Sequence, residues 1–302
     1  MYRETTPTHQ MISVVCFFLS AVFAQPLVAD DGPDCAPQTS IDCRAVGNDF
    51  AQKVGDLIKA GKTVAPAELK KQLEAEKTWK LETAVPSTAV HQPTEIYANC
   101  RESVVLVGSI YNCGKCSKWH PTVASGFVIG SEGIIVTNFH VIAGSGTTKI
   151  AATGVRTCDG TIYPVKEILA SNKLTDLAVL KIAATGLKPL PVADDVAVGT
   201  RVYCIGHPER RFYTMTEGIV SGDFKNNNGR REISVTCDYA KGSSGGPILD
   251  ETGAVVGIVR VTHTVYANKT NGIPTNVQMT WKFVAPCSDL LKLLQEKDMA
   301  SE

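Results

Sequence analysis

The stretch Lys241-Gly242-Ser243-Ser244-Gly245-Gly246-Pro247 lies between two apolar runs, at 233–237 and 248–249, and is expected to be a tight loop joining two strands. Glycine at three of its positions permits backbone angles and close approaches that a side chain would block. A serine in such a loop can expose its hydroxyl while backbone N–H groups lie close to a substrate. By itself, the pattern also fits an ordinary turn.

The sequence on both sides of this loop consists of short β-type runs separated by Gly- and Asn-bearing turns, without intervening helices. This texture is typical of an all-β barrel or sandwich. A break near 184–197 divides the runs into two halves of about six strands each. The expected strands are 103–111, 125–129, 133–137, 149–156, 161–169, 177–182, 201–205, 213–224, 232–237, 246–249, 254–264 and 277–285.

Residues 25–94 differ from this β-rich part because their apolar residues recur at helical spacing. A first helix is expected around Phe50 and ends before Gly61, and a second is expected from Pro66 to about residue 80. The Pro- and Ser-containing residues 86–93 are expected to be a linker. We interpret the segment as a packed appendage; a removable pro-segment and a partner-binding cap are the alternatives.

Residues 1–24 have the pattern of an export signal, with Arg3 near the start, an apolar run at 11–23 and small residues that fit cleavage after Ala24. A buried strand or helix is the alternative interpretation. The run is too short for a comfortable membrane span, and no other segment is long enough for one. We therefore expect an exported protein, periplasmic or extracellular, with no stable membrane span.

The charge balance and the cysteines limit the classes of partner. Lysine plus arginine equals aspartate plus glutamate, 30 against 30, so neither nucleic acid nor an acidic membrane is an expected partner. Ten cysteines fit an oxidising compartment and disulfide bonds. Cys113, Cys116 and His120 have three interpretations: disulfide bonding, half of a zinc site, or a redox pair. No metal ligand is assigned.

Acyl transfer to water requires a hydroxyl nucleophile, a base within hydrogen-bond reach, a carboxylate that orients the base, and N–H donors for the oxyanion. Among the six histidines, His140 alone follows a buried-looking strand, 134–137, and is the candidate base, although a lone histidine is by default structural. Asp176 directly precedes the apolar run 177–180. A buried aspartate needs a partner, which is either a histidine N–H or a backbone N–H in a turn.

Taken together, four blocks of the sequence resemble the trypsin-like serine peptidases, in particular the protease domain of the HtrA/DegP type. The resemblance covers roughly residues 95–286 and implies two six-stranded antiparallel β-barrels, at about 95–186 and 187–286, with the active site in the cleft between them. The blocks are Ser-Gly-Phe-Val-Ile at 125–129, Thr-Asn-Phe-His-Val at 137–141, Asp-Leu-Ala-Val-Leu at 176–180 and Gly-Ser-Ser-Gly-Gly-Pro at 242–247.

The resemblance also implies the roles of individual residues. His140, Asp176 and Ser244 match the catalytic triad of the family, and the backbone N–H groups of Gly242 and Ser244 match its oxyanion hole. Chemistry of this kind requires no cofactor. Its substrates are proteins or peptides.

Two departures from the family pattern matter. Pancreatic-type members carry an aspartate just before the catalytic serine, where this chain has Ser243, so their activation by a new N-terminus is not expected here. HtrA proteins have asparagine at that position, and Ser243 is similar to asparagine in size and polarity. HtrA proteins also continue into PDZ domains, whereas 16 residues follow Pro286, and residues 287–302 are expected to form a C-terminal helix.

The substrate pocket is predicted less sharply. Alignment with pancreatic enzymes places Asp238 at the pocket floor, where it favours Arg or Lys, but alignment with HtrA enzymes makes it a structural aspartate. Residues 257–262 are expected to form the pocket wall, so Arg260 and Thr262 face either the substrate or Asp238. An Arg260–Asp238 ion pair would cancel a basic preference, and we favour a specificity that is not trypsin-like.

The sequence therefore predicts an exported serine endopeptidase that acts through an acyl-enzyme. The alternatives are a protein of the same fold that binds or scaffolds with little turnover, and a quality-control factor that combines peptidase and chaperone activity. The oligomeric state is not predicted.

Overall fold

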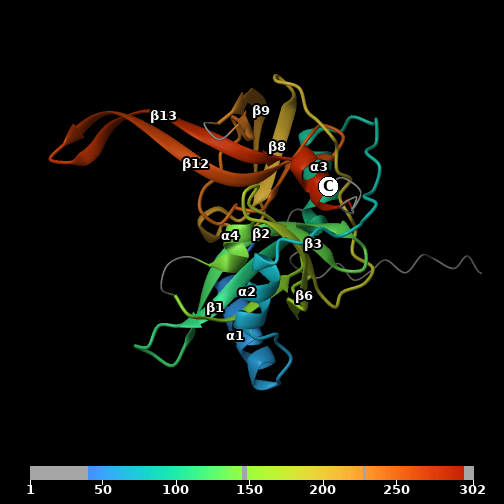
Figure 1. The fold of residues 1–302 in the computed structure, drawn as a ribbon, viewed down its shortest axis with the longest axis vertical. Helices are drawn as coiled ribbons and strands as arrows, with labels where there is room; N and C mark the ends of the chain where they lie inside the picture. Colours follow the sequence, from blue (N-terminus) through green and yellow to red (C-terminus); the bar gives the residue numbers. More distant parts are fainter. Residues whose placement is uncertain (1–39, 145–147, 227–228, 296–302) are drawn as a thin grey trace, which may run out of the picture. The chain divides into compact units, whose positions relative to one another are not determined.

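The computed structural model describes residues 40–144, 148–226 and 229–295, so the expected export signal at 1–24 lies outside the described residues. Seven antiparallel strands form the first sheet, in the order β5-β4-β1-β2-β3-β7-β6. Figure 1 labels β1, β2, β3 and β6 of this sheet. The strands are β1 Val104–Asn112, β2 Trp119–Gly130, β3 Ile134–Thr137, β4 Ile150–Arg156, β5 Ile162–Pro164, β6 Glu167–Asn172 and β7 Leu177–Lys181.

The two edge strands of the first sheet are consecutive in the chain, so the sheet curls into a barrel whose edges are joined by the chain and not by strand pairing. Only Val165 and Lys166 separate β5 from β6. The Val165 N–H donates to the carbonyl of Thr153 in β4, and the Lys166 N–H donates to that of Lys181 in β7. One expected strand, 161–169, thus changes partner midway, which gives seven strands where the sequence predicted six.

The second sheet is a closed barrel with the strand order β10-β13-β12-β11-β8-β9. The mostly-β architecture of two sheets with short N-terminal helices and a C-terminal helix is confirmed. The strands are β8 Arg201–Gly206, β9 Thr214–Lys225, β10 Arg231–Val235, β11 Pro247–Leu249, β12 Val255–Thr270 and β13 Ile273–Pro286.

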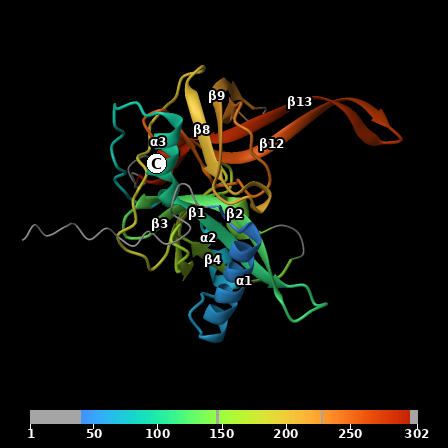
Figure 2. The ribbon, with the colours of Figure 1, turned by 180° about the vertical axis from the view of Figure 1, so that it is seen from behind.

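Helix α1 (Cys43–Lys59) packs on the first barrel (Figure 2). Its Phe50 and Val54 are fully buried. They lie over Gly108 of β1 and Gly154 of β4, which are paired across the two strands. A Cβ on Gly108 would approach the Phe50 ring to 2.9 Å, so the glycine pair provides the room for this ring. Complete burial of one such side chain contributes roughly 1.5–3 kcal/mol.

Backbone hydrogen bonds tie the segment after helix α2 (Pro66–Glu74) to three separate parts of the chain. The carbonyl of Lys77 accepts from Ser171 in β6, Trp79 donates to the end of helix α5 (Cys287–Leu293), and His91 donates to Glu251 beside the second barrel. Helix α3 (Pro93–Cys100) follows, at residues where the sequence predicted a linker and the approach to the first strand. Residues 75–92 therefore lie along the β-rich part as an extended strap.

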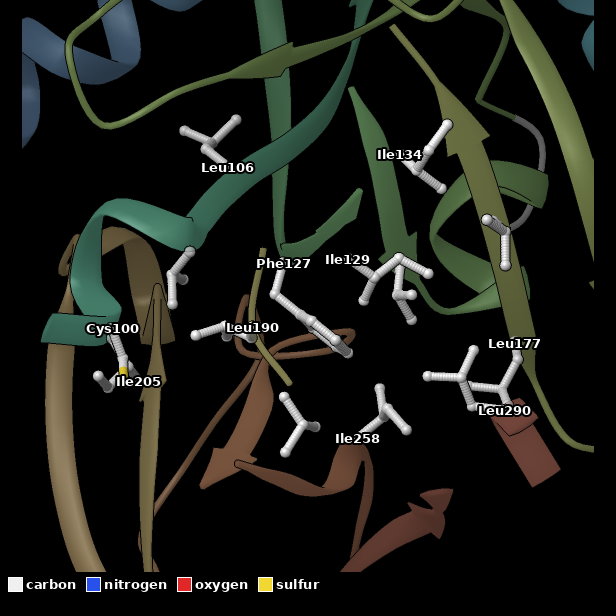
Figure 3. Packing of buried hydrophobic residues seen from close by; sticks show 14 of the residues in the cluster. Cys100, Leu106, Phe127, Ile129, Ile134, Leu177, Leu190, Ile205, Ile258 and Leu290 are labelled. Carbon is white, nitrogen blue, oxygen red and sulfur yellow. The ribbon is translucent and has the colours of Figure 1, made fainter. Parts of the chain in front are cut away.

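One apolar core joins the two barrels (Figure 3). Phe127 of β2 and Leu106 of β1 belong to the same buried cluster as Ile205 of β8, Ile258 of β12 and Leu290 of α5. The cluster fixes the relative position of the barrels, because its side chains are close-packed and almost fully buried.

Strands β12 and β13 are longer than the sequence predicted, and their far ends project from the second barrel as a two-stranded hairpin (Figures 1 and 2). Pairing continues to Thr270 opposite Ile273, beyond the expected strands 254–264 and 277–285.

Among the described residues, no helix has both the length and the apolar character needed to cross a bilayer.

Candidate active site

The first barrel brings His140 and Asp176 together. His140 lies in the short helix α4 (Phe139–Ala143) directly after β3, and Asp176 immediately precedes β7, which pairs with β3. His140 Nδ1 is 2.8 Å from Asp176 Oδ2, and the His140 backbone N–H donates to Asp176 Oδ1 at 3.0 Å. The carboxylate therefore contacts both the ring and the main chain of the histidine.

The backbone of Asp176 adds two further bonds to the same turn. Its carbonyl oxygen accepts from the N–H of Phe139 at 3.1 Å and from Nδ2 of Asn138 at 3.0 Å. Asp176 also has a left-handed backbone, with φ of 62°, which costs a non-glycine residue energy unless its surroundings fix it. These four bonds hold the histidine segment against the start of β7.

This arrangement sets the chemistry of the imidazole. A carboxylate only accepts hydrogen bonds, so Nδ1 is the donor of this pair and Nε2 of a neutral imidazole is left as an acceptor. The His140 side chain is 49% exposed, whereas that of Asp176 is 15% exposed. The half-buried carboxylate thus orients an imidazole that is itself half exposed.

Residues 241–246, the serine loop, enter from the second barrel. Gly242 has φ of 103°, and a Cβ there would collide with the carbonyl oxygen of His207. Gly245 has φ of 81°, and a Cβ there would collide with Thr137 of β3. Both glycines are required by close backbone approaches, as the sequence predicted for this loop.

Ser125 of β2 joins the serine loop to the first barrel. Its backbone N–H donates to the carbonyl of Ser244 at 2.9 Å, and its hydroxyl donates to the carbonyl of Gly242 at 2.9 Å. Its own carbonyl accepts from Oγ1 of Thr137 at 2.8 Å. Thr137 stands three residues before His140, so the loop is held beside the histidine turn. Ser125 lies in one of the family-like blocks, but its role was not predicted; a serine within an otherwise apolar run was the available signal.

The carbonyl of Ser244 accepts from the N–H of Ser125, which places Ser244 beside β2 of the first barrel. Within the described parts of the chain, no hydrogen bond joins the Ser244 hydroxyl to His140. Within the same residues, the backbone N–H groups of Gly242 and Ser244 donate to no protein acceptor. Both donors are therefore available to an oxyanion. Catalytic hydrogen bonds are often loose in a ligand-free protein and tighten in the complex.

His207, which precedes the loop between β8 and β9, lies under the serine loop. His207 is completely buried. Its backbone N–H donates to the Ser125 hydroxyl at 3.1 Å, and its ring Nδ1 accepts from the backbone N–H of Tyr213 at 3.1 Å. Burial lowers the pKa of His207 to about 4. The ring is therefore neutral near pH 7 and serves as a packing element below the loop.

The predicted pocket residues lie apart from one another. The Asp238 side chain is 91% exposed and lies 3.6 Å from Nζ of Lys282. Arg260 does not form the ion pair with Asp238 that we considered: its Nη1 is 2.9 Å from Oε1 of Glu232, and its Nε is 4.0 Å from Oδ2 of Asp176. Thr262 is exposed on β12. Glu232 of β10, which the sequence did not indicate as a partner, therefore pairs with Arg260 in place of Asp238.

The cysteines differ widely in environment. Cys158 is disulfide-bonded, and the other described cysteines are free. In the exposed loop between β1 and β2, the sulfur atoms of Cys113 and Cys116 are 3.6 Å apart, and Nε2 of His120 is 3.2 Å from the Cys116 sulfur. Hydrogen bonds from the main chain of Lys115 and the side chain of Cys116 lower the pKa of Cys113.

Comparison with known proteins agrees with this geometry. Residues 124–258 match the family model described as a trypsin-like peptidase domain. The chain is 34% identical over 170 residues to the serine endoprotease DegS of Escherichia coli, a match that covers 52% of this chain and 46% of that protein. It is 36% identical over 151 residues to the chloroplastic Protease Do-like 1 of Arabidopsis thaliana, covering 44% of this chain and 32% of that protein.

The solved structure of the HtrA-type protease AlgW with a decapeptide has the same fold. It superposes with a TM-score of 0.51 at 24% identity and covers 65% of this chain and 64% of that one. The matched part of this chain spans less than half the length of the two curated relatives described above.

Proposed function

Since this chain contains a trypsin-like protease domain of the HtrA type, we propose that it is a serine endopeptidase with Ser244, His140 and Asp176 as its catalytic triad. The observation that carries the proposal is the double contact between Asp176 and His140, with the serine loop bonded through Ser125 to the strand that leads into His140.

Each residue has a defined part in the proposed reaction. The Ser244 hydroxyl attacks the peptide carbonyl while Nε2 of His140 accepts its proton, and Asp176 stabilises the resulting imidazolium. The N–H groups of Gly242 and Ser244 donate to the oxyanion. His140 then gives the proton to the departing amine, and a water molecule hydrolyses the acyl-enzyme by the same steps.

We further propose that the substrates are proteins or peptides and that the protein acts after export. The substrate would lie along β12, near Arg260 and Thr262. Asp238 is exposed and close to Lys282, so it offers no buried charge that would select Arg or Lys. Export is supported by the pattern at 1–24 and by relatives such as the probable periplasmic DegP-like endoprotease of Brucella suis, 37% identical over 158 residues.

Cleavage of an unfolded protein substrate by the processed chain tests the proposal. Ser244→Ala should abolish cleavage, whereas Ser243→Ala is the matched control. Ser243 is the neighbouring residue, and among the described residues its buried hydroxyl has no hydrogen-bond partner, so its removal should leave cleavage intact. Equal cleavage by the wild type and Ser244→Ala would refute the proposal. No cleavage by either, with binding of the unfolded substrate by both, would favour the alternative of a binding or chaperone-like protein.

A further inference from the structure

The loop from Cys113 to His120, here called the cysteine loop, gathers three side chains of metal-binding chemistry. The two sulfur atoms and an imidazole nitrogen all lie within 4.8 Å of one another. The loop joins β1 to β2 and is separate from the candidate active site in the part of the chain that the structure describes. The peptidase proposal uses none of these three residues.

The distances fit a tetrahedral metal ion. Zn–S bonds of about 2.3 Å and Zn–N bonds of about 2.05 Å at tetrahedral angles separate two sulfurs by about 3.8 Å, and a sulfur from a nitrogen by about 3.6 Å. The observed separations are 3.6 Å between the sulfurs of Cys113 and Cys116 and 3.2 Å between Cys116 and Nε2 of His120. These two separations are each a few tenths of an ångström shorter than the tetrahedral values, and the third, between the Cys113 sulfur and the imidazole, is within 4.8 Å.

The surrounding residues favour the same arrangement. Tyr111 pairs with His120 across β1 and β2, and the two rings are 5.5 Å apart, which restricts the orientation of the imidazole. Asn112 accepts the N–H of Gly114 at 2.7 Å and shapes the turn between the cysteines. Residues 112–120 include two lysines and no carboxylate, so the donor set suits a soft ion such as Zn²⁺ and not Mg²⁺ or Ca²⁺.

We propose that Cys113, Cys116 and His120 bind one Zn²⁺ ion, with a water molecule in the fourth position. The two thiols lose their protons on binding, so two thiolates neutralise the charge of the ion. Three protein ligands leave the site open, unlike a closed four-ligand structural site. The ion would join the end of β1 to the start of β2 and stiffen the exposed loop.

A disulfide between the two cysteines is the competing state. It would use both sulfurs but would leave the imidazole of His120 beside them without a function. In the structure both cysteines are free thiols. The position of His120 therefore favours the metal over the disulfide.

Metal uptake by the full processed chain, reduced and freed of metal with a chelator, tests the proposal. We expect the wild type to bind one more Zn²⁺ per chain than the double variant Cys113→Ser/Cys116→Ser. Co²⁺ in place of Zn²⁺ should give the intense thiolate charge-transfer absorption of a tetrahedral site. His120→Ala removes a direct ligand. It should therefore weaken Zn²⁺ binding by at least roughly 10- to 100-fold, which is the loss caused by removing a side chain that only hydrogen-bonds to a ligand. Cys43→Ser and His263→Ala, which change a free cysteine and an exposed histidine elsewhere, should leave uptake unchanged.

A second measurement needs no variant. In the wild type, Zn²⁺ should protect Cys113 and Cys116 from alkylation, as read by peptide mass spectrometry, while the alkylation of Cys43 is unchanged. Equal zinc uptake by the wild type and the double variant would overturn the proposal. A Cys113–Cys116 disulfide that forms again in air despite saturating Zn²⁺ would also overturn it.

Discussion

The two barrels contribute to the candidate site in different ways. In the first barrel, His140 and Asp176 are joined by hydrogen bonds beside the paired strands β3 and β7, so local structure alone arranges this candidate base and its acid. In the second barrel, the loop that carries Ser244 is bonded both to Val259 of its own barrel and, across the barrels, to Ser125 of the first. The candidate base is therefore arranged within one barrel, whereas the position of the candidate nucleophile depends also on contacts between the barrels.

This difference suggests that two classes of substitution should behave differently. Changes in the first barrel should affect the proton transfer itself and leave the serine loop in place. Changes below the serine loop should affect the alignment of the nucleophile and the oxyanion donors, and should leave the His140–Asp176 pair intact.

Asp176→Asn should have the largest effect among them. It keeps the size of the side chain but presents an amide N–H to His140, which favours the wrong tautomer; we expect kcat to fall on the order of 10⁴-fold. Steady-state cleavage of a peptide substrate measures this. The exposed acid Asp238→Asn is the control and should change kcat little. A loss of less than tenfold in Asp176→Asn would contradict the role of the carboxylate.

Gly242→Ala should have the next largest effect on activity. Its Cβ would collide with the carbonyl of His207 and displace one oxyanion donor, so we expect kcat/KM to fall on the order of 10²–10³-fold. Gly186→Ala is a matched control, since this glycine also has a positive φ but has open space around its Cβ position. Similar activity losses in the two variants would show that backbone strain alone, and not the position of the loop, causes the effect.

Ser125→Ala should have a smaller effect on turnover. The variant loses the hydroxyl bonds to Gly242 and His207 but keeps the backbone bond to Ser244. Each lost bond is worth about 1 kcal/mol, so we expect kcat/KM to fall roughly tenfold or more. Ser109→Ala, which removes a buried hydroxyl bonded to Thr153 in the same barrel, should cost stability but not activity. Unchanged activity in Ser125→Ala would remove this residue from the description of the site.

For His207 we expect an effect of pH on the free energy of unfolding and not on turnover. Its pKa is lowered by burial to about 4, against about 6.5 in the unfolded chain, so the unfolded chain binds the proton first. The contribution of neutral His207 to the free energy of unfolding is fully present above pH about 6.5. It is lost as the pH falls to about 4, which lowers the free energy of unfolding by roughly 3 kcal/mol. Urea unfolding at several pH values should show a weaker acid dependence in His207→Asn than in the wild type or in His263→Ala. The same slope in all three would exclude His207 as the cause.

Much of the fold was predictable because its signals are local. The strand runs and the two helices near Phe50 and Pro66 follow from side-chain periodicity and from glycine and proline at the helix ends. The sequence missed helix α3, although Pro93 and a capping box formed by Gln92 and Glu95 mark its start. It also could not show that one strand changes partner at Val165, because that depends on curvature of the whole sheet.

The candidate site was predictable in part for the same reason. His140, Asp176 and Ser244 lie in recognisable blocks, and the contact between the first two follows from the pairing of β3 with β7. Ser125 and Glu232 were missed because their roles arise from contacts between segments far apart in the sequence. Arg260 contacts Glu232 instead of Asp238. Long-range ion pairs of this kind leave no trace in sequence spacing.

Labelling of the folded, processed protein with a fluorophosphonate probe tests the central claim most directly, because the probe reacts only with an activated serine. We expect a single labelled site at Ser244, identified by peptide mass spectrometry, with labelling lost in His140→Ala and retained in Ser243→Ala. Absence of label on Ser244, or equal labelling with and without His140, would contradict the proposal that the two barrels form one catalytic site.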